Sequence, residues 1–330
     1  MTYESLDFYK SKKILITGGT GYLGSVLACA LSSVSSKLVL LLREGQSFDE
    51  NWISKPRISL VRGDIRIRDT WERALDGVEY VFHFASLESR YGVSPEPVID
   101  LETNVLPMLH LLEICKDSEL KVKILFSGSE NEVGVAPRVP VNETFQDNPV
   151  TIFGIHKLMA EKYLQYYSRE FGMQTVTLRL SNVYGPTSRR DRAVQVVLNK
   201  IIYNASLKGK ITIFGDGTFI RDYVFVEDVI NSFLTAGINM DTVNTKHYYI
   251  GNGIGHRLVD AVNLIADRVA LKKGQRPIIE YIPPPLGLSA FDKRNFVSDT
   301  ARFHMDTGWS PNVPLEEGVD RTINYFIKNS

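Results

Sequence analysis

Near the start of the chain a short apolar run leads directly into a cluster of glycines, a junction that few folds accept. Residues 13–17 read Lys-Ile-Leu-Ile-Thr and predict a strand, and residues 22–31 predict a helix. Between them Gly18, Gly21 and Gly24 stand at GxxGxxG spacing. Such a loop turns tightly, lets a pyrophosphate approach bare backbone, and faces the positive end of the helix dipole. The loop therefore predicts a dinucleotide site; the alternative is a glycine-rich turn without a ligand.

More short apolar runs follow, at 38–42, 80–85 and 122–127. They do not alternate apolar with polar residues, which is typical of strands covered on both faces in a parallel sheet. Strands separated by helical patterns predict an α/β fold with a Rossmann-like doubly wound parallel sheet. The rhythm loosens later, so we expect a dinucleotide-binding domain over 1–183. A smaller, mostly C-terminal substrate lobe is expected over 184–330, with some segments returning to the first domain.

Two long helical patterns lie in the first domain. The first, 98–115, is apolar around much of its circumference, so we expect it to be mostly buried, with a dimer interface as one setting for it. Pro107 is expected to kink it. The second pattern, 152–171, is followed by Gly172, which suits the end of a helix.

Composition excludes several classes of protein. The 330 residues include 38 Lys+Arg and 38 Asp+Glu, and this balance argues against binding to nucleic acid or to an anionic membrane. No apolar run approaches the ~20 residues that span a bilayer. Cys29 and Cys115 form no CxxC pair, and the six histidines lack metal-ligand spacing, so no metal is expected. With acidic residues near the N-terminus, these features favour a soluble, cytoplasmic protein.

The end of the second apolar run, 38–42, bears on the choice of cofactor. An acidic residue there favours NAD, whereas an arginine neutralises the 2′-phosphate of NADP. The chain has Arg43, which slightly favours NADP, although Arg43 could equally stack on adenine or face solvent. Asp64 and Ile65 follow a third short strand and are placed to contact the adenine. The alternative for Asp64 is a turn residue after Gly63.

Several further motifs stand in a fixed order along the chain. They are Arg62-Gly63-Asp64, His83-Phe84-Ala85, Asn104-Val105, Phe126-Ser127-Gly128-Ser129, Phe153-Gly154-Ile155-His156-Lys157, residues 178–186 (Leu-Arg-Leu-Ser-Asn-Val-Tyr-Gly-Pro), Phe214-Gly215-Asp216-Gly217 and Arg221-Asp222-Tyr223. With the glycine loop, this set resembles the extended short-chain dehydrogenase/reductases that act on nucleotide sugars. That family includes UDP-glucose 4-epimerase-like epimerases, 4,6-dehydratases and UDP-glucuronate decarboxylases. The resemblance extends from about Lys12 to about Phe326, and it is not specific for one reaction.

The resemblance implies a catalytic Tyr-x-x-x-Lys pair on one helix face and a Ser or Thr at a strand end. The lysine lowers the tyrosine pKa, and the phenolate takes the proton of a substrate hydroxyl while hydride leaves its carbon. Lys157 and Ser129 match this pattern, but the tyrosine position holds Phe153, which has no proton to exchange.

Three interpretations of Phe153 stay open. It is an engineered replacement of tyrosine that stops turnover, or a natural residue with another acid/base at work, or the mark of an inactive binder; we favour the first. Tyr91, in the loop after the fourth strand, is a substitute that the sequence cannot test. His156 is expected on the helix surface.

The resemblance also assigns the remaining site residues. The cofactor contacts that it implies are Gly18, Gly21, Tyr22, Leu23, Gly24, Arg43, Asp64, Ile65, Phe84, Ala85, Asn104 and Lys157. On the substrate side it implies contacts with the diphosphate from Asn182, Arg221 and Arg294, with Ser129 and Tyr91 at the sugar. Glu130 is a further catalytic candidate, although an exposed loop carboxylate is the alternative. For Arg294 the alternative is a solvated charge.

The function that follows is epimerisation of a nucleotide-diphosphate sugar through a 4-keto intermediate, with NAD or NADP as cofactor. An NADPH-dependent 4-ketoreductase or a dehydratase is the alternative. Asn131 disfavours dehydration, because dehydratases place a carboxylate there. A third possibility, from another class, is a non-catalytic dinucleotide-binding protein. The resemblance further implies a homodimer.

Overall fold

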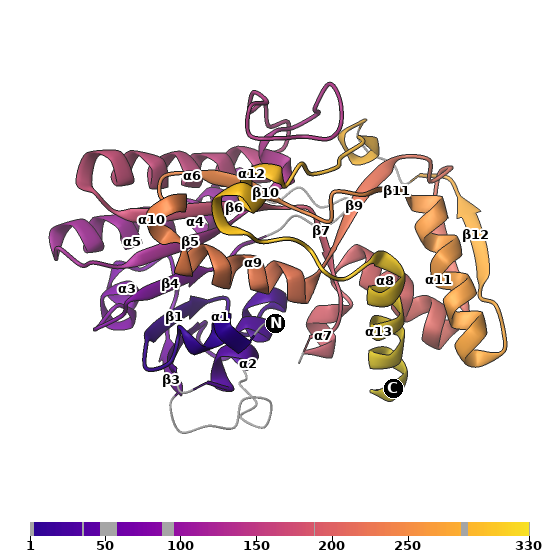
Figure 1. Cartoon of the computed structure of the whole chain (residues 1–330), viewed down its shortest axis with the longest axis horizontal. Helices are drawn as coiled ribbons and strands as arrows, with labels where there is room; N and C mark the ends of the chain where they lie inside the picture. Colours follow the sequence, from indigo (N-terminus) through magenta and orange to yellow (C-terminus); the bar gives the residue numbers. More distant parts are fainter. Residues whose placement is uncertain are drawn as a thin grey trace.

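The structure, a computed structural model, describes residues 3–34, 36–46, 58–87, 96–187, 189–284 and 290–329. Its centre is a seven-stranded sheet in the order β10-β6-β5-β4-β1-β2-β3, in which every neighbouring pair is parallel (Figure 1). The strands are β1 (Lys13–Thr17), β2 (Lys37–Leu42), β3 (Ile58–Arg62), β4 (Tyr80–His83), β5 (Lys123–Ser129), β6 (Gln174–Leu180) and β10 (His247–Ile250). The predicted Rossmann-like sheet is confirmed.

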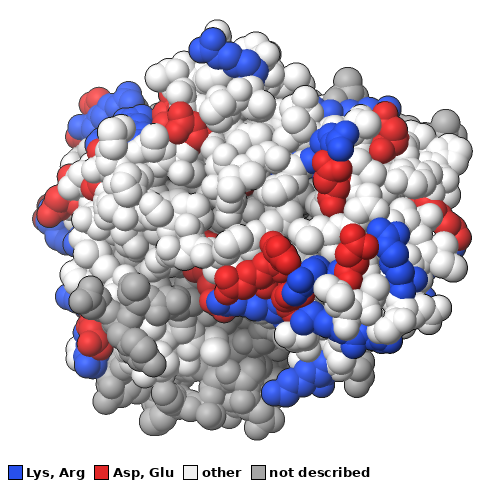
Figure 2. Space-filling model, turned by 45° about the vertical axis from the view of Figure 1, so that its right-hand side comes forward, with Lys and Arg blue, Asp and Glu red and all other residues white. Residues whose placement is uncertain are grey.

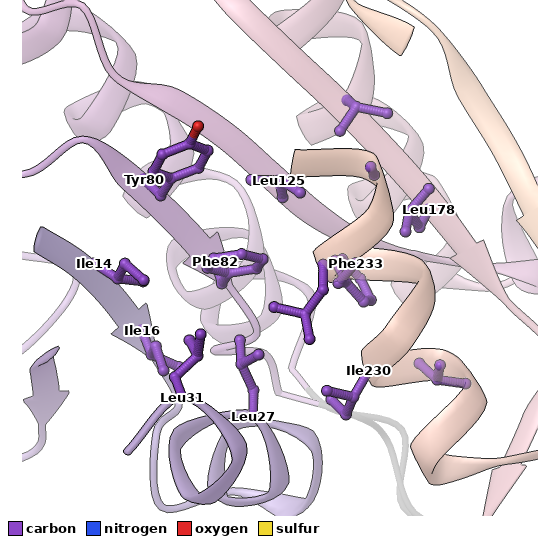
Figure 3. Close-up of a cluster of buried hydrophobic side chains, with 14 of the residues drawn as sticks. Ile14, Ile16, Leu27, Leu31, Tyr80, Phe82, Leu125, Leu178, Ile230 and Phe233 are labelled. Carbon is purple, nitrogen blue, oxygen red and sulfur yellow. The ribbon is translucent and has the colours of Figure 1, made fainter. Parts of the chain in front are cut away.

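Both faces of this sheet are buried, as the continuous apolar runs predict. In β1, Ile14 and Ile16 face one hydrophobic cluster, and Leu15 between them faces another. Figure 3 shows the first cluster, where Phe82 and Phe233 pack between the sheet and the helices. Each face therefore needs a layer of helices.

Two sets of helices form these layers (Figure 1). On the side of Ile14 lie α1 (Tyr3–Asp7), α2 (Tyr22–Ser32), α9 (Val226–Ile238), α10 (Met240–Val243) and α12 (Ala301–Thr307). On the side of Leu15 lie α3 (Arg68–Ala74), α5 (Leu106–Asp117) and α6 (Ile152–Phe171), with α4 (Pro97–Asn104) in contact with α5 and α6.

The order of the strands fixes where a ligand can bind. The chain runs outward from β1 to β2 and β3, then returns to β4 on the other side of β1. At such a reversal the loops after the two strands diverge and leave a crevice at their carboxyl ends. The glycine loop follows β1 and therefore lies at this crevice.

A second lobe has its own hydrophobic cluster, formed mainly by residues after position 184 (Figure 1, right). A three-stranded sheet joins β7 (Asn182–Tyr184), β9 (Ile220–Phe225) and β11 (Gly255–Arg257), and a two-stranded sheet joins β8 (Lys210–Phe214) to β12 (Ile278–Ile282). The helices of this part are α7 (Arg190–Ala193), α8 (Val197–Tyr203), the π-helix η3 (Asn204–Lys208), α11 (Leu258–Lys273) and α13 (Leu315–Lys328). The short 3-10 helices η2 (Glu130–Glu132) and η4 (Ala290–Lys293) are linked by the ion pair between Glu130 and Arg294, the residue after η4. Three later elements belong to the first domain: β10 is a strand of the seven-stranded sheet, and α9 and α12 lie in the helix layer on the side of Ile14.

The expectation of one kinked, mostly buried helix over 98–115 is wrong. The structure has two helices, α4 and α5, that meet at Val105, and Pro107 lies in the first turn of the second. Proline suits that position because the first-turn N–H groups have no partner inside the helix. Although α5 is largely buried, Val98, Ile99 and Leu101 of α4 are exposed.

The surface charges agree with the balanced composition. On the face shown in Figure 2, basic and acidic side chains are interspersed, and no large region of that face carries basic side chains alone. Among the described helices, none combines the length and the apolar character needed to cross a bilayer.

Candidate functional site

The glycine loop packs so tightly that side chains would not fit. The N–H of Gly21 donates to the carbonyl of Gly18 at 2.7 Å, and Gly18 has a φ of 67°. A Cβ on Gly24 would lie 2.2 Å from the Gly18 carbonyl oxygen. Gly21 caps α2 without a side-chain hydrogen bond, and the first turn of α2 contains no acidic residue. The backbone N–H groups of the first turn of α2 can therefore receive a pyrophosphate, so the loop fits a dinucleotide.

The loop after β4 is held against the glycine loop by a buried pair that sequence reasoning missed. Thr17 Oγ1 lies 2.8 Å from His83 Nδ1 and accepts a hydrogen bond from the Ala85 N–H. Burial, reinforced by the charge of Lys157, lowers the pKa of His83 to about 3, so this imidazole is neutral. Phe84, beside it, packs edge-on against Phe233.

The residues predicted to lie near the adenine follow β2 and β3, and several of them are arginines. Arg43 is exposed at the end of β2, and Arg62 donates to the carbonyl of Gln46 at 2.8 Å. Asp64 is held by Arg66, whose hydrogen bonds lower the pKa of the carboxyl. The structure thus brings Arg43 and the Asp64 segment to the ends of neighbouring strands, with Ile65 buried beside Asp64.

Helix α6 carries the predicted catalytic motif. Thr151 caps it by accepting from the N–H of Gly154 at 3.0 Å. A Cβ on Gly154 would lie 2.6 Å from the Asn131 carbonyl oxygen, so α6 and η2 touch at this glycine. Lys157 is buried and donates to the Ser127 carbonyl at 2.8 Å; its Nζ is 5.6 Å from the centre of the Phe153 ring. Phe153 is buried, so its phenyl group lines the interior beside the lysine.

Ser129 ends β5 and caps η2 in a capping box. Its Oγ accepts from the Asn131 N–H, and its own N–H donates to Glu132 Oε1 at 2.7 Å. The role of Glu132 was missed by sequence reasoning, although the spacing Ser-x-x-Glu is the signal for a capping box. The orientation of Ser129 thus depends on a fully buried carboxyl group.

Beneath Ser129 lies a buried charge cluster of one guanidinium and three carboxyl groups. Arg179 contacts Glu132, Glu161 and Asp147 at 2.6 to 2.9 Å. Burial raises the pKa of Glu132, and the nearby guanidinium offsets this only in part. Burial also opposes ionisation of Glu161, but Arg179 outweighs it and lowers that pKa. Burial thus opposes ionisation of both carboxyl groups, and Arg179 outweighs it only at Glu161.

Glu130 follows Ser129 in the sequence and contacts two of the predicted substrate residues, Arg294 and Asn182. Its Oε1 accepts from Arg294 Nη2 at 2.8 Å, and the Asn182 amide nitrogen lies 3.3 Å from its Oε2. Both charged side chains are less than a tenth exposed. Neither the exposed loop carboxylate nor the solvated arginine that the sequence left open is observed.

Arg221 lies next to the Glu130–Arg294 pair, and the hydrogen bonds of its guanidinium go to backbone carbonyl groups. Its guanidinium donates to the carbonyls of Ile220, Asp292 and Arg294 and stacks 4.5 Å above the ring of Phe219. Arg221 therefore holds the segment that carries Arg294. Tyr91 lies outside the described residues.

His156 is buried, so the prediction that it lies on the helix surface is wrong. Its Nδ1 is 2.6 Å from Asp100 Oδ1, and Asp100 also accepts from the Asn104 amide at 2.9 Å. Asn104 in turn bonds to Ser86 and Leu87 after β4. This chain of contacts places Asn104 beside the crevice, and its Asp100–Asn104 part was visible as an i, i+4 polar pair within one helix.

Fold and site together define an α/β protein whose glycine loop fits a dinucleotide and whose predicted site residues Ser129 and Lys157 both adjoin the carboxyl end of β5. The family pattern described as the NAD dependent epimerase/dehydratase family matches residues 14–251. The chain belongs to this family, among the extended short-chain dehydrogenase/reductases.

Individual relatives agree with this assignment. A putative UDP-glucose 4-epimerase of Methanocaldococcus jannaschii is 30% identical, with 96% of this chain and 99% of the relative covered. The crystal structure of UDP-glucose 4-epimerase from Thermotoga maritima with UDP-glucose has a TM-score of 0.82 and 30% identity, over 96% and 99% of the two chains. The Thermus thermophilus UDP-glucose 4-epimerase complex with NAD has a TM-score of 0.81 and 27% identity, over 96% and 100%.

Proposed function

We propose that the chain is a nucleotide-sugar 4-epimerase in which Phe153 arrests the reaction. When bound, the nicotinamide cofactor supplies reversible hydride transfer with a sugar carbon, and a 4-keto sugar is the intermediate. The observation that carries the proposal is the juxtaposition of Lys157 and Phe153 on one buried face of α6. The UDP-sugar activities in the names of the relatives support the same class of substrate.

Each residue has a defined task in this proposal. The glycine loop and the first turn of α2 bind the pyrophosphate, and Lys157 holds the nicotinamide ribose. The Ser129 hydroxyl hydrogen-bonds to the reacting sugar oxygen, and Asn182 and Arg294 face the diphosphate. Oxidation of the sugar hydroxyl releases a proton, which needs an acceptor in that position. A phenyl ring cannot accept it, so binding is retained while the oxidation step is blocked.

The test restores the missing hydroxyl. Phe153→Tyr is incubated with UDP-, dTDP-, CDP- and GDP-sugars and with NAD or NADP, and the products are separated by chromatography. Turnover of at least one sugar is expected to rise by about 10²–10⁴-fold, the range attributed to a positioned acid/base. Phe171→Tyr adds the same hydroxyl at the exposed end of α6 and serves as the matched control.

The opposite result has a clear meaning. If Phe153→Tyr gains no turnover with any of these sugars, the phenyl ring is not what blocks the reaction. Retained dinucleotide binding in that case would favour a non-catalytic member of the family. Lys157→Met in the Phe153→Tyr background should remove whatever activity has appeared.

A 4-ketoreductase that uses NADPH is the second candidate, and Arg43 favours it. This side chain stands exposed where a 2′-phosphate would need a positive charge. Affinities for NAD and NADP, measured for the unaltered protein and for Arg43→Gln, separate the two cofactors: a preference for NADP that Arg43→Gln removes supports the reductase.

The assembly, domain and location proposals rest on separate observations. Exposed apolar side chains of the adjoining helices α4 and α6, among them Val98 and Ile155, support a homodimer, which sedimentation can test.

The separate hydrophobic cluster of the second lobe supports a boundary between 183 and 184. Free Cys29 and Cys115 support the cytoplasm as the location.

A further inference from the structure

The chain places a carboxylate where it occupies two groups expected to hold the substrate diphosphate. Glu130 accepts from Arg294 Nη2 at 2.8 Å and lies 3.3 Å from the amide nitrogen of Asn182. Its side chain is only 9% exposed, so its charge is balanced inside the protein rather than by solvent.

The guanidinium of Arg294 is already engaged on several sides. Besides Glu130, its Nη2 contacts Asn131 Oδ1 at 2.7 Å, and its Nη1 donates to the Phe291 carbonyl at 3.1 Å. Its Cζ lies 3.6 Å from the centre of the Phe291 ring. Arg221 fixes the backbone of this segment through the Arg294 and Asp292 carbonyls. The arginine is thus held in place with its charge neutralised by Glu130.

We propose that Glu130 competes with the substrate diphosphate for Arg294, and that the sugar offsets the cost of displacing it. The proposal deepens the proposed function, on which it rests. Carboxylate and phosphate oxygens both match the fork of a guanidinium, so they exclude one another at Nη2. An incoming diphosphate must replace the carboxylate and also meets its negative charge. Once displaced, Glu130 still adjoins Ser129, where it can accept hydrogen bonds from sugar hydroxyls.

The site therefore discriminates between a nucleotide sugar and a bare nucleoside diphosphate. A nucleoside diphosphate frees the carboxylate but gives it nothing to bind, whereas a nucleotide sugar supplies hydroxyl donors. Glu130 is then a specificity-determining residue. Its removal should tighten binding of the bare nucleotide more than binding of the nucleotide sugar.

The test compares UDP with UDP-glucose by calorimetry, with CDP, dTDP and GDP in parallel. Glu130→Gln is expected to bind UDP about tenfold more tightly, because the carboxylate no longer competes for Arg294. This change in affinity corresponds to about 1.4 kcal/mol of binding free energy. For UDP-glucose the gain should be absent or below about threefold. Arg294→Gln should weaken UDP, and in the double variant Glu130→Gln should bring no gain. Glu72→Gln, at an exposed position of α3, makes the same change in net charge away from the site and should behave like the unaltered protein.

The other outcomes would overturn either the competition between Glu130 and the diphosphate or the proposed function itself. Unchanged or weaker UDP binding in a folded Glu130→Gln variant overturns the competition, and so does an equal gain for UDP-glucose. Thermal melting of each variant separates these outcomes from unfolding. If the unaltered protein and all variants bind none of the four nucleoside diphosphates, the proposed function itself fails together with this inference.

Discussion

The buried histidine beside the glycine loop should make the stability of the protein depend on pH in a calculable way. His83 lies between Trp71 and Phe126, with ring centres 5.6 and 5.8 Å away, and among the described residues its Nε2 has no hydrogen-bond partner. Burial first, and then the charge of Lys157, lower its pKa from 6.5 to about 3.

The sign follows from where the proton binds. Above pH 6.5 the imidazole is neutral in both the folded and the unfolded chain, and the full contribution to stability is present. Below pH 6.5 His83 becomes protonated in the unfolded chain, whereas in the folded chain it stays neutral until the pH falls to about 3. The free energy of unfolding therefore falls by about 1.4 kcal/mol per pH unit, or about 2 kcal/mol between about pH 6 and about pH 4.5.

Urea unfolding of the unaltered protein and of His83→Gln, followed by circular dichroism over this range, measures the effect. The variant lacks the titrating group, so its disadvantage relative to the unaltered protein should shrink by about 2 kcal/mol as the pH falls. Thr17→Val removes the hydrogen-bond partner of His83 but keeps the imidazole, so its disadvantage should stay nearly constant. A difference between His83→Gln and the unaltered protein that does not change with pH would refute the reasoning.

Two further perturbations test how the crevice is held together. Gly24→Ala would place a Cβ 2.2 Å from the Gly18 carbonyl oxygen, so the loop must shift. Dinucleotide affinity, measured by fluorescence titration, should fall at least tenfold. Unchanged affinity would mean that the loop adapts freely. Asp100→Ala leaves His156 and Asn104 without their shared acceptor and should cost about 2–4 kcal/mol of stability in urea unfolding, whereas Asp100→Asn keeps an oxygen and should cost less. Equal costs for the two substitutions at Asp100 would show that the hydrogen bonds are not the cause.

The parts of the fold that could be predicted are those that short segments specify alone. Residues 13–17 form β1 and 152–171 form α6 as expected, because continuous apolar runs and a capped amphipathic pattern carry their own signal. The break between α4 and α5 was missed because periodicity continues across Val105. Pro107 was interpreted as a kink, although it equally suits the first turn of a new helix.

The parts of the site that could not be predicted arise from several distant segments. Arg179 is an unremarkable strand residue in the sequence, yet it meets carboxyl groups from η2, α6 and the loop before α6. The Glu130–Arg294 pair joins residues 164 positions apart. No spacing rule predicts such contacts, because they depend on how the lobes fold back onto the sheet.

The departures from the family pattern are not spread over the crevice. The glycine loop and Lys157 keep the pattern on the predicted cofactor side, whereas Phe153 and Asn131, which stands where dehydratases have a carboxylate, lie where η2 meets the first turn of α6. These two elements touch at Gly154, so a change in one alters the surroundings of the other. The position of these departures therefore supports the proposal that the reaction is blocked on the predicted sugar side, because the residues proposed to bind the dinucleotide match the family pattern.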